Sequence, residues 1–252
     1  MGYFEPAPPR ILAHRGLAID VPENTLAAFR AAFDVGVTHM ETDAQVTKDD
    51  VAVLWHDESL ERWDGTKTRI RDLTLGELQR RTRQGQQIST VAEALETLPE
   101  AKFNIDVKDP DAAAAVCDGI KWVEAEQRVL LTAFSERTCR ELRKLLPLSY
   151  HGASWQRIAK ALFAIARRDE RHLAKLLSDC DAIQVPPKMA RIELLTPRRL
   201  AAYKRHVKEV HVWTINDPAE MQQWLDAGVD GVVTDRADRG IPLVSRFPSN
   251  SP

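Results

Sequence analysis

The sequence predicts one α/β domain folded as a TIM-type (β/α)8 barrel. Eight short apolar runs alternate with helical patterns between Ile11 and Asp235, and this order favours a parallel sheet whose strands are joined by helices. The length of 252 residues suits one barrel of roughly 250 residues. Neither an internal repeat nor a low-complexity linker divides the chain, so we expect residues 1–252 to form a single domain.

Each predicted strand is a short, mainly apolar run bounded by polar or turn-forming residues. One additional run, Val51 to Trp55, follows the second strand and predicts a hairpin extension of it, which leads into an insertion over residues 58–89. The eight barrel strands are predicted over Ile11–Ala13, His39–Ala44, Phe103–Val107, Val129–Thr132, Ser149–Ala153, Ala182–Val185, Val210–Thr214 and Gly231–Thr234.

The helices between these strands carry start and stop signals of their own. A capping side chain accepts hydrogen bonds from the first free amides of a helix, and a glycine after the last turn can adopt the left-handed conformation that ends it. After Asp235 only a short tail containing proline remains, so the eighth helix should be stunted. The expected signals are Asn24 or Thr25 before the first helix and Gly36 after it, a capping box of Thr90 with Glu93, and the pairs Thr196-Pro197 and Asp217-Pro218, with Gly228 ending the last of these helices.

The bulk composition narrows the class of protein. The net charge is -2, so no overall positive field indicates nucleic acid as a partner. The three cysteines, Cys117, Cys139 and Cys180, are isolated in the sequence, which indicates buried reduced thiols. No apolar stretch is long enough for a signal peptide or a membrane span. We therefore expect a cytoplasmic protein.

Charged residues interrupt two of the apolar strands. Glu41 and Asp43 lie two residues apart in the second strand. Asn104, Asp106 and Lys108 share one face of the third, because successive side chains of a strand point to opposite sides. Strand ends of a parallel barrel meet at a common mouth, where three carboxylates repel one another unless a cation lies between them. Oxygen ligands favour Mg²⁺, Ca²⁺ or Mn²⁺, so the sequence predicts a divalent-cation site.

Two histidines accompany these acids at predicted strand ends. His14 follows the first strand, and His56 follows the hairpin run. An imidazole exchanges a proton near neutral pH, so two histidines can serve as a general base and a general acid. Arg15 and Lys108 add positive charge suited to an anionic substrate. The whole set is hard to explain as packing and predicts acid–base chemistry on an anion at the barrel mouth.

Several short motifs follow one another in a characteristic order. They are His14-Arg15-Gly16, Pro22-Glu23-Asn24-Thr25, Glu41-x-Asp43, His56-Asp57, the segment from Ser89 to Leu95, Trp213-Thr214-Ile215-Asn216 and the segment from Gly228 to Asp235. In this order they resemble the glycerophosphodiester phosphodiesterase family over about residues 11–235. The resemblance implies a TIM-type barrel that hydrolyses glycerophosphodiesters to sn-glycerol 3-phosphate and an alcohol.

By position, the resemblance also implies a role for each candidate residue. At the third metal position the family commonly has glutamate, whereas this chain has Asp106, which is one methylene shorter. We therefore expect the cation to lie nearer the third strand or to gain a water ligand. The implied ligands of one Mg²⁺ or Ca²⁺ ion, or of Mn²⁺, are Glu41, Asp43 and Asp106; the implied proton-transfer residues are His14 and His56; the implied substrate contacts are Arg15, Lys108 and Trp213.

The expected chemistry is stabilisation of a phosphodiester transition state with proton transfer on both sides. The cation, Arg15 and Lys108 should stabilise the charge that grows on the phosphate. His14 is assigned as the general base and His56 as the general acid, and the residues alone leave the opposite assignment open. They are equally compatible with direct hydrolysis and with a cyclic phosphate intermediate.

Two other interpretations of the motifs stay open. The sphingomyelinase D-type phospholipases resemble this chain in their E-T-D and D-x-K runs, and lysophospholipase D-type cleavage of this kind would give a cyclic phosphate. The group lacks the Glu23-Asn24-Thr25 element, which makes it the second choice. A non-catalytic barrel that binds polyol phosphates or a protein partner is the other interpretation, and the presence of both histidines with all three acids disfavours it.

Two segments and one histidine have no assigned role. Residues 58–89 are rich in arginine, and a solvated insertion is favoured over a phosphate-steering one. Residues 155–175 combine apolar residues at helical spacing with basic residues. They fit an outer helix of the barrel, or an extra helix over its mouth, better than a helix on a membrane surface, so peripheral membrane contact is not the favoured expectation. His39 shares a face with Glu41 and is left unassigned.

Overall fold

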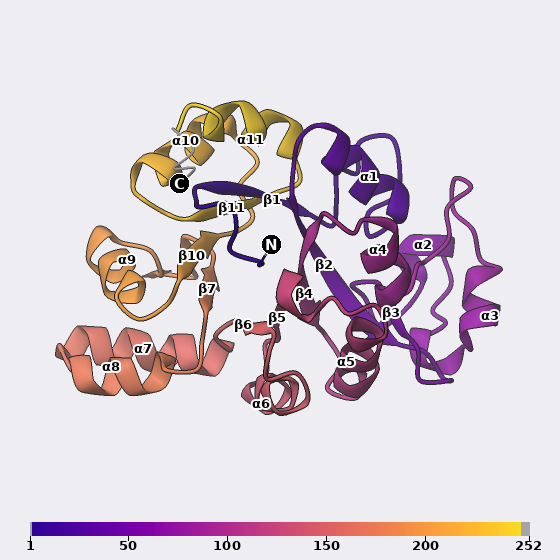
Figure 1. Cartoon of the computed structure of the whole chain (residues 1–252), viewed down its shortest axis with the longest axis horizontal. Helices are drawn as coiled ribbons and strands as arrows, with labels where there is room; N and C mark the ends of the chain where they lie inside the picture. The colour runs from indigo at the N-terminus through magenta and orange to yellow at the C-terminus, as the bar shows by residue number, and fades with distance from the viewer. Residues whose placement is uncertain (1, 248–252) are drawn as a thin grey trace.

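Eight parallel strands form the predicted barrel in the computed structural model, which describes residues 2–247 (Figure 1). The strands are hydrogen-bonded in the order β6-β5-β4-β2-β1-β11-β10-β7. A parallel bridge between Gly152 and Ala182 joins the last strand to the first, so the ring is nearly closed. The barrel strands are β1 (Arg10–His14), β2 (His39–Val46), β4 (Lys102–Val107), β5 (Val129–Thr132), β6 (Tyr150–His151), β7 (Ala182–Val185), β10 (Glu209–Val212) and β11 (Gly231–Thr234).

The predicted helix signals are confirmed. Thr25, not Asn24, caps the first helix, because its hydroxyl accepts from the amide of Ala28. The last helix is short, as expected, and contains Pro242. The helices are α1 (Leu26–Asp34), α2 (Glu61–Asp64), α3 (Leu75–Gln79), α4 (Val91–Thr97), α5 (Ala112–Trp122), α6 (Glu136–Leu145), α7 (Trp155–Arg167), α8 (Glu170–Leu177), α9 (Pro197–Lys204), α10 (Pro218–Asp226) and α11 (Ala237–Val244), with short 3-10 turns η1 (Ile70–Asp72) and η2 (Glu126–Arg128). Thr90 with Glu93, Thr196 before Pro197 and Asp217 before Pro218 cap α4, α9 and α10.

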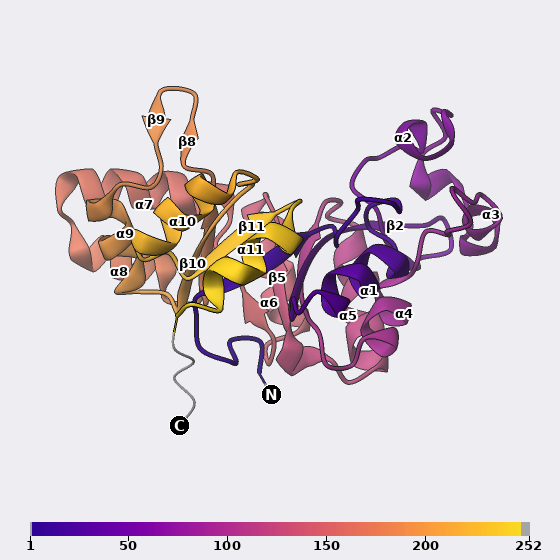
Figure 2. The same cartoon turned by 90° about the horizontal axis from the view of Figure 1, so that it is seen from above.

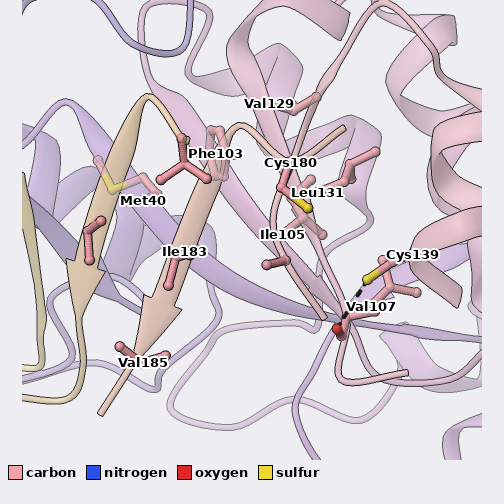
Figure 3. Packing of buried hydrophobic residues seen from close by; sticks show 14 of the residues in the cluster. Met40, Phe103, Ile105, Val107, Val129, Leu131, Cys139, Cys180, Ile183 and Val185 are labelled. Carbon is pink, nitrogen blue, oxygen red and sulfur yellow. Dashed lines mark hydrogen bonds between the residues drawn. The ribbon is translucent and has the colours of Figure 1, made fainter. Parts of the chain in front are cut away.

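The helices pack around the strands to form the main core. Phe103, Ile105 and Val107 alternate along β4 with the polar residues of its other face, and all three belong to this core (Figure 3). The cysteines Cys117, Cys139 and Cys180 are free and buried, as predicted. The thiol of Cys139 donates to the carbonyl oxygen of Ala133 at 3.2 Å, the contact drawn as a dashed line in Figure 3.

The insertion after the second strand has a small core of its own. Strand β3 (Ala52–Leu54) pairs antiparallel with β2, which confirms the predicted hairpin. Trp55 and Trp63 pack edge to face with 5.6 Å between ring centroids, within a cluster of buried residues separate from the main core. Most of the basic side chains here are paired rather than free: the pairs are Arg62 with Asp57 and Glu23, Arg69 with Asp72, Arg71 with Asp111 and Arg81 with Asp64.

The segment at residues 155–175 forms two outer helices, α7 and α8. Helix α7 buries Ile158 and Ile165, and α8 buries Leu173. Their apolar faces are therefore used against the barrel, as the favoured expectation had it. Between residues 2 and 247, no helix combines the length and the apolar character needed to cross a membrane.

The two ends of the barrel differ. The insertion with α2 and the hairpin of β8 (Lys188–Met189) with β9 (Ile192–Glu193) rise on the side opposite the chain termini (Figure 2). The N-terminal segment closes the other end: Tyr3 is buried, and Arg10 donates to the carbonyl oxygen of Pro6 at 2.8 Å and pairs with Glu209 at 2.5 Å. His39 lies in this floor, against Arg10, and not in the site. Burial and the charge of Arg10 lower the pKa of His39 well below its usual value.

Candidate active site

One cavity of about 370 Å³ at the C-terminal ends of the strands brings all the predicted site residues together. A shared mouth follows from the parallel barrel, because every strand ends on the same side. The predicted residues that line the cavity are His14, Arg15, Glu41, Asp43, His56, Asp106, Lys108 and Trp213.

Two cations lie among the three acids. Asp43 and Asp106 are neighbours in the register of β2 and β4, and the Lys108 ammonium lies between them, 2.9 Å from Asp43 Oδ1 and 2.5 Å from Asp106 Oδ2. Arg15 Nε lies 2.9 Å from Asp43 Oδ2. Burial opposes ionisation of Asp43, but the charges of Lys108 and Arg15 outweigh it and lower the pKa of this carboxyl. Asp43 is therefore held as a buried carboxylate.

The pKa of Glu41 is shifted in the opposite direction from that of Asp43. Glu41 is buried, and in the part of the chain that the structure describes its Oε2 atom has no hydrogen-bond partner. Burial, followed by the charge of Asp43, raises the pKa of Glu41 to about 8. A carboxyl held so close to other acids ionises easily only when further positive charge approaches it.

The donor chemistry of this corner fits a hard divalent cation. As the side chains stand, no group of three or more His, Cys, Asp or Glu residues within 2–247 could hold a metal ion. Lys108 supplies the positive charge between Asp43 and Asp106 instead. However, Oε2 of Glu41 has no partner within residues 2–247, and three carboxyl groups meet only two cations at this corner, so a further positive charge would keep Glu41 ionised. Oxygen donors select Mg²⁺, Ca²⁺ or Mn²⁺ for that role.

His14 is held by a carboxylate from the far end of the chain. Its Nδ1 atom lies 2.6 Å from Asp235 Oδ1, and its Nε2 atom lies 3.8 Å from Glu41 Oε2. Asn216 donates to the second oxygen of Asp235 at 2.7 Å. A proton on Nδ1, shared with Asp235, leaves the Nε2 lone pair toward the cavity. Burial lowers the pKa of His14, but the hydrogen bond to Asp235 and the charge of Glu41 outweigh burial and raise it.

His56 has a carboxylate partner of its own. Its Nδ1 atom lies 2.6 Å from Asp57 Oδ1. Arg62 from the insertion pairs with Asp57, and it also pairs with Glu23 at 2.7 Å. Glu23 in turn pairs with Arg15 at 2.9 Å. The insertion therefore fixes one wall of the site through a chain of ion pairs.

The sequence did not single out several of these partners. Asn24 donates to Asp43 Oδ2 at 3.2 Å and accepts from the Thr42 hydroxyl at 2.7 Å, which accounts for the polar element before the first helix. Asp57 directly follows His56 in its motif, and Asp235 is the last residue of the segment that begins at Gly228. No pattern in the sequence indicates that Asp235 meets His14, 221 residues away.

The other half of the cavity is apolar. Phe134 and Trp155 stack with 5.7 Å between ring centroids and 15° between planes, and Ile158, Trp213 and Val233 also line this side. An anionic group can therefore lie against the charged half while a carbon skeleton packs against the apolar half.

Replacing Asp235 with asparagine should lower the pKa of the His14 imidazole. In the native protein that pKa should exceed the usual value of about 6.5, because the hydrogen bond to the Asp235 carboxylate favours the charged ring. A pH titration of the His14 ring by NMR measures both values. The matched control is Asp57→Asn, which removes the carboxylate partner of His56 and should leave His14 unchanged. Equal His14 values in the native protein and in Asp235→Asn would contradict this.

Comparisons with known proteins agree on one family. The model of the "Glycerophosphoryl diester phosphodiesterase family" matches residues 14–239. A Mycobacterium tuberculosis protein named "Probable glycerophosphodiester phosphodiesterase 2" is 32% identical over 90% of this chain and 87% of its own length. A glycerophosphodiester phosphodiesterase from Thermotoga maritima has a similar crystal structure, with a TM-score of 0.72, 27% identity and coverage of 92% and 97% of the two chains. An Oleispira antarctica phosphodiesterase, solved with the product sn-glycerol-3-phosphate, shares the fold at a TM-score of 0.73 and 22% identity, over 94% and 96%.

Proposed function

Because the chain belongs to the glycerophosphoryl diester phosphodiesterase family, we propose that it hydrolyses glycerophosphodiesters to sn-glycerol 3-phosphate and an alcohol, using two histidines and a divalent cation. One observation carries the proposal. A single cavity holds two carboxylate-bonded histidines, three acids and two cations, all on the charged side of the pocket. The sn-glycerol-3-phosphate complex of the Oleispira antarctica protein supports this product.

The phosphate binds beside Arg15 and Lys108. Both side chains are partly buried and already face Asp43, so the phosphate meets two fixed positive charges with little water between them. Arginine offers two parallel donors to phosphate oxygens, and lysine acts as a point charge. These residues orient the phosphodiester and offset the negative charge that grows during attack.

His14 is the general base. Its hydrogen bond to Asp235 holds the ring so that Nε2 faces the cavity, as in other catalytic pairs of a carboxylate and a histidine. Nε2 takes a proton from the attacking hydroxyl, which belongs either to water, giving sn-glycerol 3-phosphate directly, or to the glycerol, giving a cyclic phosphate that water then opens. His56, held by Asp57, gives a proton to the leaving alcohol oxygen.

Glu41, Asp43 and Asp106 would hold the cation. When bound, a divalent ion neutralises charge on a non-bridging phosphate oxygen. The shorter Asp106 lies 2.5 Å from Lys108 through its Oδ2 atom, so Lys108 and the cation compete for the same carboxylate. Mg²⁺ or Ca²⁺ is the expected ion, and Mn²⁺ is the third choice.

Chelation of divalent cations should abolish turnover of glycerophosphocholine, and Mg²⁺, Ca²⁺ or Mn²⁺ should restore it. Phosphorus NMR of the products reports sn-glycerol 3-phosphate directly and separates it from a cyclic phosphate, which has its own resonance. Asp106→Asn should raise the cation concentration needed for half-maximal rate about tenfold or more, by analogy with other metal-site substitutions. Asp111→Asn, at an exposed acid paired with Arg71, is the control and should change nothing. Full turnover in chelator would refute the cation requirement.

One observation favours a second candidate substrate class. The apolar half of the cavity continues to Phe134, whose side chain is exposed although it lines the pocket. A monoacylated glycerophosphodiester could lay its chain along this surface, which would make the activity of the lysophospholipase D type. Comparison of glycerophosphocholine with lysophosphatidylcholine at equal concentration tests this. Phe134→Ser should lower the rate with the acylated substrate selectively.

A further inference from the structure

Two buried oxygen atoms at the bottom of the cavity have no hydrogen-bond partner among residues 2–247. They are Glu41 Oε2 and Asn104 Oδ1. The two residues are direct neighbours in the register of β2 and β4, one layer below Asp43 and Asp106. Asn104 is 2% exposed and, like Glu41, lines the cavity. Buried polar atoms are nearly always paired in folded proteins, so two adjacent exceptions indicate that a binding partner is missing from both.

A chain of hydrogen bonds through the barrel interior fixes the orientation of the Asn104 amide. Arg10 pairs with Glu209 at 2.5 Å, so Glu209 is an acceptor, and His211 Nε2 donates to it at 2.8 Å. With its one proton on Nε2, the neutral His211 ring accepts from Gln184 Nε2 through Nδ1 at 2.9 Å. Gln184 Oε1 is left to accept from Asn104 Nδ2 at 3.2 Å. Each bond dictates the next, and the last one uses the Asn104 nitrogen, which leaves its oxygen as the free atom.

The hydrogen-bonding chemistry of Glu41 Oε2 and Asn104 Oδ1 indicates what kind of group binds them. When Glu41 is ionised, as a bound cation would keep it, both atoms are acceptors and neither can satisfy the other. A water molecule could donate to both oxygens, but it would bring no positive charge to a corner that holds three acids and two cations. A hard cation can contact several oxygens at once, and amide oxygens are common ligands of Ca²⁺. The arrangement therefore favours a positive ion over a neutral donor.

We propose that Asn104 Oδ1 is a fourth protein oxygen donor of the divalent-cation site, and that Gln184 is the positioning residue that holds it. This inference rests on the cation requirement of the proposed function. It adds a neutral ligand to the three carboxylates. The chain of hydrogen bonds from Arg10 to Gln184 would then hold that ligand in position. Gln184 acts through Asn104, because its bond to Nδ2 prevents the amide from turning its nitrogen toward the ion.

Calorimetric titration of the full chain with Ca²⁺, and separately with Mn²⁺, tests the role of Asn104. Asn104→Leu keeps the approximate volume but removes the oxygen, and it should weaken cation binding about tenfold or more. Asn104→Asp keeps an oxygen at the same place and adds charge, so it should bind the cation at least as tightly as the native protein. Gln45→Leu is the matched control: Gln45 is a buried amide of β2 that donates to the His56 carbonyl oxygen, and its loss should leave cation affinity within about twofold.

Gln184→Leu separates a positioning role from a purely structural one. It should weaken cation binding about tenfold, whereas the double variant with Asn104→Leu should bind no more weakly than Asn104→Leu alone, because the two residues act through one oxygen. Thermal unfolding of each variant identifies any that fail to fold. If Asn104→Leu is one of them, the cation affinity of Asn104→Asp tests the inference instead. Asn104→Leu binding cations as tightly as the native protein would overturn the inference while leaving the proposed hydrolysis intact. A native protein that turns over substrate but binds no divalent cation would overturn both the inference and the cation requirement.

Discussion

Replacing either His14 or His56 with alanine should lower kcat on glycerophosphocholine by about a thousandfold, since a positioned proton donor or acceptor contributes about 10²–10⁴ to a rate. Each ring has one nitrogen bound to a carboxylate, Asp235 or Asp57, at 2.6 Å. Each is therefore held in one orientation at the cavity. KM should change less than kcat, because both rings act on protons in transit more than on the bound phosphate.

Steady-state kinetics across pH measure this effect and its cause. The general base must be neutral to act, and the pKa of His14 is raised. The rate should therefore fall as the pH drops through the pKa of His14, and His14→Ala should remove this acidic limb. The matched control is His172→Ala, at an exposed histidine of α8, which should keep native turnover. The double variant should lose little more than either single one, because the two rings serve one reaction. Near-native turnover in either single variant would refute the assignment of that histidine.

Replacing Glu209 with leucine should lower the free energy of unfolding by about 3–5 kcal/mol, the usual effect of removing one partner of a buried ion pair. The side chains of Arg10 and Glu209 are 6% and 3% exposed, and their atoms lie 2.5 Å apart. Without Glu209, the guanidinium is left in the barrel floor beside carbonyl oxygens of the N-terminal segment and His39. The carboxylate also supports His211, so the loss should loosen both the N-terminal segment and the barrel interior.

Urea denaturation followed by circular dichroism measures this loss. Glu170→Gln is the matched control, because Glu170 pairs with Arg205 on the surface and exposed pairs contribute little to stability. A second variant, Arg10→Met with Glu209→Leu, should recover part of the loss, because it removes the unpaired charge as well. Equal destabilisation by Glu209→Leu and Glu170→Gln would show that the buried pair contributes no more to stability than an exposed pair.

The sequence by itself determined the barrel and the meeting of the predicted site residues at one cavity. Alternating strands and helices dictate a parallel sheet, and a parallel barrel collects every strand end at one mouth. The two-residue period of a strand then decides which side chains point inward. Glu41, Asp43 and Asp106 therefore had to share a cavity with His14 and His56, and they do. The helix caps were equally predictable, because a cap depends only on residues three positions apart.

Only the tertiary structure decided which polar groups meet. Asp235 reaches His14 because barrel closure places β11 beside β1, and sequence separation carries no information about that contact. The same holds for the Lys108 ammonium between two acids and for the chain that ends at Asn104. Hydrogen bonds and charge pairs depend on strand register and side-chain rotamers to within about 0.5 Å. A hydrophobic pattern specifies the face of an element and does not reach that precision.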